Sequence, residues 1–355
     1  MTRTSIAQVA DVVFGRRRER RNVGTSAPRR DTPAGRPSAG RPGKARWRWA
    51  RRLLVAAAAS AVAATLSSFI YNAATAGRAR EPAGLRFVTA DGIRTRYRQW
   101  GGGDGPPVVL VHGFAESADT FDPLGRALAG RRRVYALDLT GWGYSRREGP
   151  YDADHQAAQV LGFLDALHLD HVTLVGHSTG AAVVAAATLR SPDRVSRLVF
   201  LDGDGLNTGA GAGATGLQTA LPPPYRTTLL RLAVRSDWLI RRIYESNCGP
   251  GCPHLDRAGV DQWRRPLKVA GAEDGIWHMT SIVGLPATRV AALAGVPISK
   301  AVVFGSADDV FARSSPYETA KRIGAPAPVL VPGARHLSFI SNPGQVASAI
   351  TGGGG

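Results

Sequence analysis

The sequence of 355 residues predicts an α/β protein in which helices cover both faces of a mostly parallel sheet. Two observations support this fold class. From residue 81 onward, short apolar runs alternate with stretches of helical periodicity. The runs are apolar at nearly every position, which is typical of strands buried on both faces of a parallel sheet. A composition of 44% hydrophobic and 20% charged residues is ordinary for a protein with a sizeable core.

The first 52 residues carry most of the charge. They contain 15 Lys and Arg against 3 acidic residues, which accounts for +12 of the formal net charge of +18. Because this segment is also rich in Gly and Pro, we expect residues 1–52 to form a disordered basic tail. Anionic lipid headgroups suit such a tail better than RNA or DNA, and the rest of the chain is too close to neutral to predict a nucleic-acid partner.

Residues 53–76 contain no charged side chain and are long enough to cross a lipid bilayer as a helix. Five cationic residues lie among residues 44–52, with Trp47 and Trp49 between them, and Tyr71 lies near the other end. Cations on one side and aromatic residues at both borders predict a single-pass signal anchor in the cell membrane. The N-terminus is then cytoplasmic, and the following domain lies outside the cytoplasm.

Two other interpretations of this segment stay open. Ala74-Thr75-Ala76 resembles the small-residue site at which export signals are cleaved. The segment is also rich in alanine, which contributes little transfer energy, so a soluble helix is the remaining alternative.

Beyond residue 81 the elements can be assigned in order. Residues 85–90 and 95–100 predict a hairpin around Asp91-Gly92. We expect further strands and intervening helices from the apolar pattern. The strands are at residues 108–111, 134–137, 172–175, 198–201, 298–304 and 329–331, and the helices include 154–167 and 181–189.

The alternation stops between residues 202 and 298. An excursion of this length is too long for a plain loop. It holds a glycine-alanine run at 209–213 and helical pieces at 227–233 and 238–244. We therefore predict a core made of residues 81–205 and 296–355, interrupted by a helical cap at 206–295.

The strongest chemical signal is Ser178, in the motif from Gly176 to Gly180. The motif follows an apolar strand and precedes the helix-like run of Ala and Val at residues 181–187, which is the context of a nucleophile elbow. Small residues at 176 and 180 are needed because neighbouring side chains would collide with the sharply turned backbone. A serine in this position is expected to act as a nucleophile.

A nucleophilic serine needs a base that is oriented by an acid. In this arrangement the chain order is Ser, acid, His. His336 follows the last apolar strand and fits the base, and Asp308 follows the strand before it and fits the acid. The alternatives for the acid are its neighbour Asp309 and a second pair at residues 202 and 204, Asp202 and Asp204.

Two backbone N–H groups are expected to bind the developing oxyanion. Thr179, directly after the nucleophile, contributes one, and Phe114, in the loop after residues 108–111, contributes the other. Gly113 allows the backbone to approach closely, and we interpret His112 as a residue that braces this loop.

Five motifs in this order resemble the α/β-hydrolase superfamily, in its cap-bearing branch with a serine nucleophile. They are His112-Gly113-Phe114, the loop from Asp138 to Ser145, the elbow at Ser178, the segment Gly305 to Asp308, and His336. The resemblance covers residues 85–350 and implies an eight-stranded sheet with a helical cap after the sixth strand. The branch includes esterases, haloperoxidase-like enzymes without a cofactor and epoxide hydrolases. Because epoxide hydrolases and haloalkane dehalogenases use aspartate as nucleophile, serine at 178 disfavours those two activities.

These features predict a membrane-anchored carboxylic ester hydrolase that forms an acyl-enzyme on Ser178, with no cofactor and no metal. Its partners are a small ester or acyl substrate and, through residues 53–76, the lipid bilayer. A haloperoxidase or acyltransferase activity on the same triad is one alternative, and a membrane-tethered binding protein without turnover is another. The residues that bind substrate and the oligomeric state are not assigned.

Cys248 and Cys252 both lie in the expected cap. In an exported domain they are expected to form a short-range disulfide. A pair of free thiols, or a zinc site that includes His254, remains the alternative.

Overall fold

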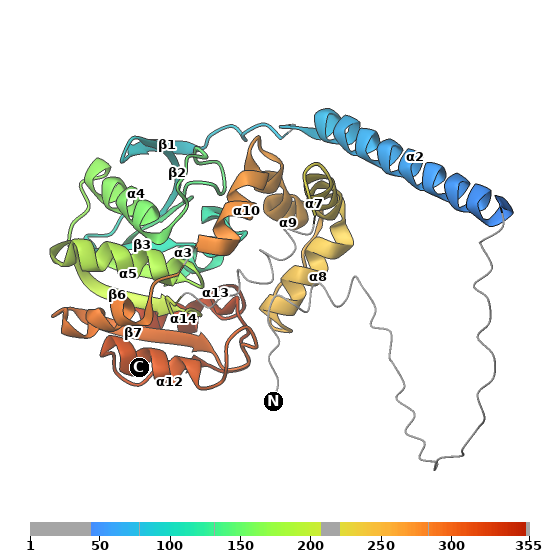
Figure 1. Ribbon diagram of the computed structural model, residues 1–355. Helices are drawn as coiled ribbons and strands as arrows, with labels where there is room; N and C mark the ends of the chain where they lie inside the picture. Colours follow the sequence, from blue (N-terminus) through green and yellow to red (C-terminus); the bar gives the residue numbers. More distant parts are fainter. Residues whose placement is uncertain (1–43, 78, 131, 207–220, 283, 353–355) are drawn as a thin grey trace, which may run out of the picture.

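The computed structural model describes residues 44–77, 79–130, 132–206, 221–282 and 284–352. Its centre is an eight-stranded sheet with the order β1-β2-β4-β3-β5-β6-β7-β8 (Figure 1). The strands are β1 (Arg86–Ala90), β2 (Ile93–Trp100), β3 (Gly105–Val111), β4 (Arg132–Leu137), β5 (Val172–His177), β6 (Val195–Leu201), β7 (Ser299–Gly305) and β8 (Val329–Val331). β2 pairs antiparallel with β1 and β4, and the other pairs are parallel. The predicted fold class is confirmed.

Helices cover both faces of this sheet, as Figure 1 shows. One hydrophobic cluster joins the sheet to helices α4 (Ala153–Ala166), α5 (Gly180–Arg190), α11 (Ala287–Ala291) and α12 (Ser315–Ile323). A second cluster joins the opposite face to α3 (Asp122–Leu128), α13 (Ser338–Ser341) and α14 (Pro343–Thr351).

The central strand β3 explains why the strands are apolar at nearly every position. Val109 and Val111 belong to the first cluster, whereas Val108 and Leu110 belong to the second. Alternate residues of a strand point to opposite faces of the sheet, and all four of these side chains are fully buried. Burying such a side chain contributes about 1.5–3 kcal/mol, so this strand anchors both halves of the core.

Among the described residues, four α-helices lie between β6 and α11, on the segment that we predicted as a cap. They are α7 (Tyr225–Arg235), α8 (Asp237–Cys248), α9 (Arg257–Arg264) and α10 (Ala272–Ile282). The segment leaves and re-enters the core at one place, because Leu206 forms a parallel bridge with Leu285 and the Leu285 N–H donates to the carbonyl of Gly205 at 3.0 Å. The glycine-alanine run at 209–213 lies outside the described residues.

The apolar N-terminal segment forms the long helix α2 (Lys44–Thr75), which begins nine residues before the expected span. Residues Arg46–Thr75 are long and apolar enough to span a membrane, with a mean hydropathy of 2.0 in their most apolar part. The helix projects away from the core, and only its C-terminal end lies beside α7 (Figure 1).

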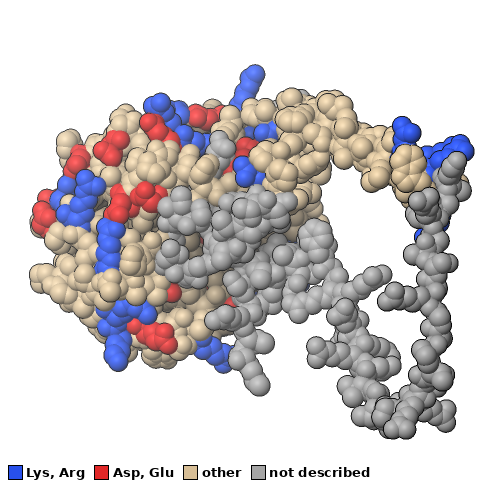
Figure 2. Space-filling model, in the orientation of Figure 1, with Lys and Arg blue, Asp and Glu red and all other residues tan. Residues whose placement is uncertain are grey.

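The charged side chains of the described residues are distributed as the sequence indicates. Figure 2 shows acidic and basic side chains interspersed over the visible face of the core, while basic side chains gather at the N-terminal end of α2. The predicted tail itself, apart from residues 44–52, lies outside the described residues.

Candidate active site

Ser178 occupies a sharp turn between β5 and α5. Its φ is +50°, a left-handed conformation that a non-glycine residue seldom adopts. The turn is possible because its neighbour Gly180 has no side chain. A Cβ atom at Gly180 would lie 2.6 Å from the carbonyl oxygen of Val111 and 2.7 Å from that of His112. The elbow predicted from the sequence is therefore present, with the serine half-buried at the carboxyl end of the sheet.

The structure brings Ser178, His336 and Asp308 together in one hydrogen-bonded chain. His336 Nε2 lies 3.0 Å from Ser178 Oγ, and His336 Nδ1 lies 3.0 Å from Asp308 Oδ2. The Asp308 side chain is 2% exposed and that of His336 is 10% exposed. A neutral imidazole held in this way can accept the serine proton at Nε2 while Nδ1–H donates to the carboxylate.

The other candidate acids do not contact the imidazole ring. Asp309 points away and pairs with Arg335 at 3.1 Å. Asp204 accepts a hydrogen bond from its own loop, at the N–H of Leu206. Of the four candidate carboxylates, only that of Asp308 forms a hydrogen bond with His336.

Asp202 nevertheless lies within the site, behind the histidine. Its carboxylate accepts hydrogen bonds from the N–H of Gly305 at 2.7 Å and from Ser338 Oγ at 2.5 Å. Burial, reinforced by the nearby Asp308 carboxylate, raises the pKa of Asp202 to about 7. Asp202 therefore links the loop that carries Asp308 to the segment that follows His336.

The expected oxyanion residues lie on two loops that touch each other. A Cβ atom at Gly113 would lie 2.8 Å from Ser178 Cβ, so the absence of a side chain there lets the loop of Phe114 close over the nucleophile. Thr179 precedes the first residue of α5, where the positive end of the helix dipole favours negative charge. The Phe114 ring packs edge-on against Trp142, with ring centroids 5.1 Å apart.

The sequence analysis missed a buried ion pair between Glu116 and His177. His177 Nδ1 lies 3.0 Å from the Glu116 carboxylate, and His177 Nε2 lies 3.0 Å from the carbonyl oxygen of His336. Glu116 also accepts a hydrogen bond from the N–H of Gly113. The pair thus links the oxyanion loop, the elbow and the histidine loop. No sequence signal predicts it, because the two residues are 61 positions apart and meet only when the three loops converge.

Opposing effects set the charge state of this pair. Burial lowers the pKa of His177, but the Glu116 carboxylate and its hydrogen bond outweigh burial and raise the pKa to about 9. Burial raises the pKa of Glu116, but the His177 cation outweighs it and holds that pKa below the ordinary value. Both groups are therefore charged at neutral pH, and the imidazolium donates from both ring nitrogens.

His112 and Asp138 brace the remaining loops. His112 Nε2 accepts a hydrogen bond from the N–H of Leu139, and Nδ1 lies 2.8 Å from the carbonyl oxygen of Gly113. Burial lowers the pKa of His112, in keeping with a neutral ring. The fully buried Asp138 carboxylate accepts hydrogen bonds from the N–H groups of Ala118 and Tyr144.

The end of α8 is attached to the histidine loop. The N–H of Leu337 donates to the carbonyl of Asn247 at 3.0 Å, and Arg335 donates to the carbonyl of Ser246 at 2.7 Å. The next turn is closed by a disulfide between Cys248 and Cys252.

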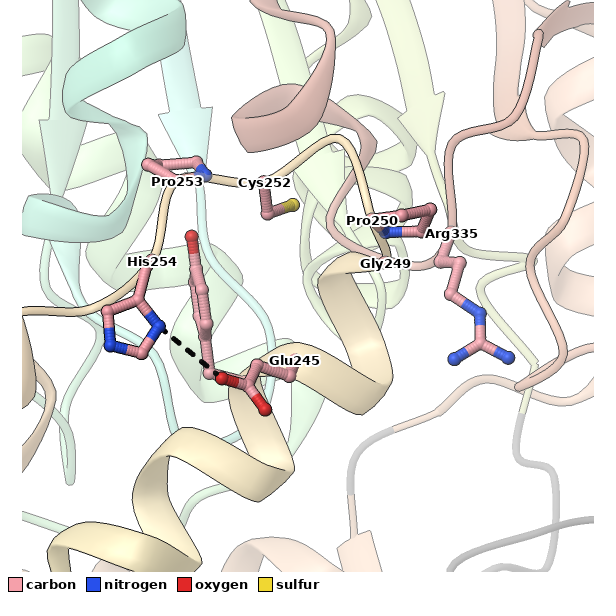
Figure 3. A pocket seen from close by; sticks show the side chains of 8 residues that line it. Glu245, Gly249, Pro250, Cys252, Pro253, His254 and Arg335 are labelled. Carbon is pink, nitrogen blue, oxygen red and sulfur yellow. Dashed lines mark ion pairs between the residues drawn. The ribbon is translucent and has the colours of Figure 1, made fainter.

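A surface pocket of about 340 Å³ lies at this junction. Figure 3 shows Glu245 and His254 facing each other there, 3.7 Å apart, with Arg335 on the other side. Because both cysteine sulfurs are in the disulfide, they are not zinc ligands in this structure. Among the described residues, no group of three or more His, Cys, Asp or Glu side chains could hold a metal ion.

Residues 106–247 match the family model for the alpha/beta hydrolase fold. The chain is 35% identical over 218 residues to a 2-hydroxymuconate semialdehyde hydrolase of Pseudomonas putida, a match that covers 57% of this chain and 73% of that relative. It is 39% identical over 127 residues to a 2-hydroxy-6-oxo-2,4-heptadienoate hydrolase of the same species. That second match covers 34% of this chain and only 45% of the relative.

Among solved structures, a bacterial membrane phospholipase A superposes with a TM-score of 0.61 at 22% identity, over 86% of this chain and 97% of the other. At this identity the likeness concerns the fold. The two Pseudomonas putida relatives are named as hydrolases and support hydrolase activity. Taken with the family model and the sheet topology, they show that this chain belongs to the α/β-hydrolase family.

Proposed function

We propose that the chain is a membrane-anchored serine hydrolase that cleaves a carboxylic ester through an acyl-enzyme on Ser178. The observation that carries the proposal is the pair of 3.0 Å hydrogen bonds that join Ser178 to His336 and His336 to Asp308. A serine with this base and acid, half-buried at a strand end, is equipped for acyl transfer.

In the proposed reaction, His336 Nε2 removes the hydroxyl proton as Ser178 Oγ attacks the ester carbonyl carbon. The N–H groups of Phe114 and Thr179 stabilise the oxyanion, and Asp308 stabilises the imidazolium. The tetrahedral intermediate then expels the alkoxide, which takes the proton from His336 and leaves as the alcohol. Water attacks the acyl-enzyme with His336 again as base, which releases the carboxylic acid and restores the serine.

The proposed organisation follows the sequence. Residues 81–205 and 296–355 form the catalytic core, residues 206–295 form the cap, and residues 53–76 anchor the chain. The cationic residues that precede the anchor favour a cytoplasmic N-terminus and an extracytoplasmic active site.

A second candidate comes from one relative. The 35% identical protein from Pseudomonas putida is named for hydrolysis of 2-hydroxymuconate semialdehyde, and the match covers 73% of its length. Activity on that compound would use the same serine and histidine, so the two candidates differ in substrate and not in the residues that act.

The test uses the full-length chain in detergent with a fluorophosphonate probe, p-nitrophenyl esters of increasing acyl length, and 2-hydroxymuconate semialdehyde. We expect labelling and ester turnover in the native chain and loss of both in Ser178→Ala. Turnover of the semialdehyde alone would favour the second candidate. A folded chain that neither labels nor turns over any of these compounds would refute the proposed enzyme and favour a binding protein.

A further inference from the structure

Helices α7 and α8 expose an apolar and cationic face. Leu229 and Leu232 on α7 are 50% and 49% exposed, and Trp238 and Ile243 on α8 are 65% and 44% exposed. Two arginines, Arg235 and Arg242, and the carboxylate of Glu245 are exposed on the same two helices. We call the four apolar residues and the two arginines the cap face. Solvent-exposed Leu and Trp gathered on adjacent helices are typical of a surface that contacts something apolar.

The cap face adjoins the proposed membrane anchor. α7 lies beside the C-terminal end of α2, and α7 and α8 occupy the side of the molecule from which α2 projects (Figure 1). The exposed apolar side chains of α2 and those of α7 therefore lie on helices that contact each other.

A polar seam holds the two helices together. Thr65, Ser68, Asn72 and Thr75 are spaced three or four residues apart on α2, so they lie on one face of that helix. Ser68 is buried and the other three are half-buried, whereas Leu66, Phe69 and Ile70 between them are exposed.

Residues of α7 form hydrogen bonds with the polar groups of this seam. Thr65 Oγ1 lies 2.5 Å from the Tyr225 hydroxyl, and Asn72 accepts a hydrogen bond from Thr228 Oγ1 at 3.0 Å. Arg231 donates to Thr75 Oγ1 and to the carbonyl of Asn72, at the end of α2 where the helix dipole favours a cation. These contacts fix the height of α7 along the anchor.

That height places α7 at the membrane boundary. Counted from Leu53, about twenty helical residues cross a hydrocarbon core of about 30 Å and end near Asn72. Thr65 lies about 10 Å below that level at a rise of about 1.5 Å per residue. The start of α7 lies at the boundary itself, because Asn72 Nδ2 donates to the carbonyl of Pro224 at 2.9 Å. The Tyr225 side chain extends from there toward Thr65, near the level where tyrosine and tryptophan are favoured.

We infer that the cap face is a lipid-contacting surface, held in the outer headgroup region of the bilayer by the polar seam between α2 and α7. The inference rests on the proposed anchoring. Leu229, Leu232, Trp238 and Ile243 enter the acyl boundary, and Arg235 and Arg242 contact anionic headgroups. Such a cap meets an apolar ester in the bilayer directly, without its passage through water.

The test is photo-crosslinking in membranes. The full-length chain is reconstituted into vesicles of phosphatidylethanolamine and phosphatidylglycerol with benzoylphenylalanine at one of three exposed positions, which replace Phe69 on α2, Leu232 on the cap face or Tyr317 on α12. The native residues are 57%, 49% and 55% exposed, which makes Tyr317 a matched control on the core. Circular dichroism verifies that each variant is folded.

We expect lipid adducts at positions 69 and 232 at comparable levels, and only background at position 317. Adducts at 69 without adducts at 232 would leave the anchor standing and overturn the inference about the cap face. Equal adduct levels at 232 and 317 would overturn it as well. Absence of adducts at 69 would refute the anchoring and the inference with it. The readout does not require ester hydrolysis, so failure of the proposed catalysis would be seen separately.

Discussion

The candidate active site and the predicted cap both contain ion pairs, and two of these pairs differ in burial. At the site, the Glu116 and His177 side chains are 6% and 0% exposed. In the cap, Asp261 on α9 pairs with Arg265, which directly follows that helix, and both side chains are 43% exposed. A buried charge needs its partner, whereas an exposed charge that loses its partner is solvated by water.

This difference teaches which parts of the molecule must remain fixed. The three loops that carry Phe114, Ser178 and His336 are tied to one another through buried groups, and each of those groups has a partner on another loop. The polar contacts between cap and core use exposed or half-exposed side chains and backbone groups, whereas Tyr244, Cys248 and Val260 pack apolar surface into the core. We therefore expect polar substitutions in the cap to cost less than substitutions of the buried polar groups at the site.

The largest loss of activity is expected when Asp308, whose carboxylate is hydrogen-bonded to His336, is replaced. Asp308→Asn should lower kcat on a p-nitrophenyl ester about ten-thousand-fold, because the amide cannot stabilise the imidazolium or hold the reactive tautomer. Asp202→Asn should cost much less activity, since Asp202 contacts Gly305 and Ser338 and not the ring. If Asp202→Asn alone abolished turnover, the assignment of the acid to Asp308 would be wrong.

The second prediction compares how much each of the two ion pairs contributes to the free energy of unfolding. Glu116→Gln leaves a buried imidazolium without a counter-charge and should lower the free energy of unfolding by about 3–5 kcal/mol. Asp261→Asn, which breaks the exposed pair on α9, should cost less than about 1 kcal/mol. Denaturant unfolding of the two variants in the same detergent measures both. Equal losses would contradict the contrast between site and cap.

Local patterns predicted the parts of the molecule that local interactions determine. β3 to β8 were predicted because each contains a short apolar run, and β1 and β2 because they flank the turn at Asp91-Gly92. The elbow was predicted because Gly176, Ser178 and Gly180 lie close together in the sequence. Ser178, His336 and Asp308 were found by their order after successive strands, and the structure brings them together.

Contacts between distant loops could not be predicted in this way. The partner of His177 is 61 residues away on another loop, and nothing in the spacing distinguishes Glu116 from a surface carboxylate. The polar seam of α2 was overlooked for the same reason. Thr65 is 160 residues from Tyr225, so the sequence of α2 alone does not show that Thr65 forms a hydrogen bond with α7.

The pH dependence of stability should reveal the buried pair at the site. Because the pKa of His177 is raised from 6.5 to about 9 on folding, its contribution is complete below pH 6.5 and is lost as the pH rises through 9. The loss amounts to roughly 3 kcal/mol. The contribution of Glu116, whose pKa is lowered, is present above its ordinary value of 4.5 and declines as the pH falls further.

Unfolding free energies of the native chain and of the double variant Glu116→Gln, His177→Gln, measured from about pH 5.5 to about pH 9.5, isolate this contribution. The difference between the two should shrink on the alkaline side. Parallel curves over the whole range would show that the pair is not ionised in the folded state.

A modest effect is expected from the disulfide of the cap. The disulfide between Cys248 and Cys252 closes a loop with a sequence separation of 4, so its loss should cost only about 2 kcal/mol. Because Asn247 beside it accepts the hydrogen bond of Leu337, the loss should be accompanied by a higher KM rather than by loss of the fold. Thiol counting, thermal unfolding and ester kinetics with and without reductant test this. Two free thiols in the untreated protein would exclude the link, and a drop in kcat as large as that of Asp308→Asn would mean that the cap is as fixed as the site.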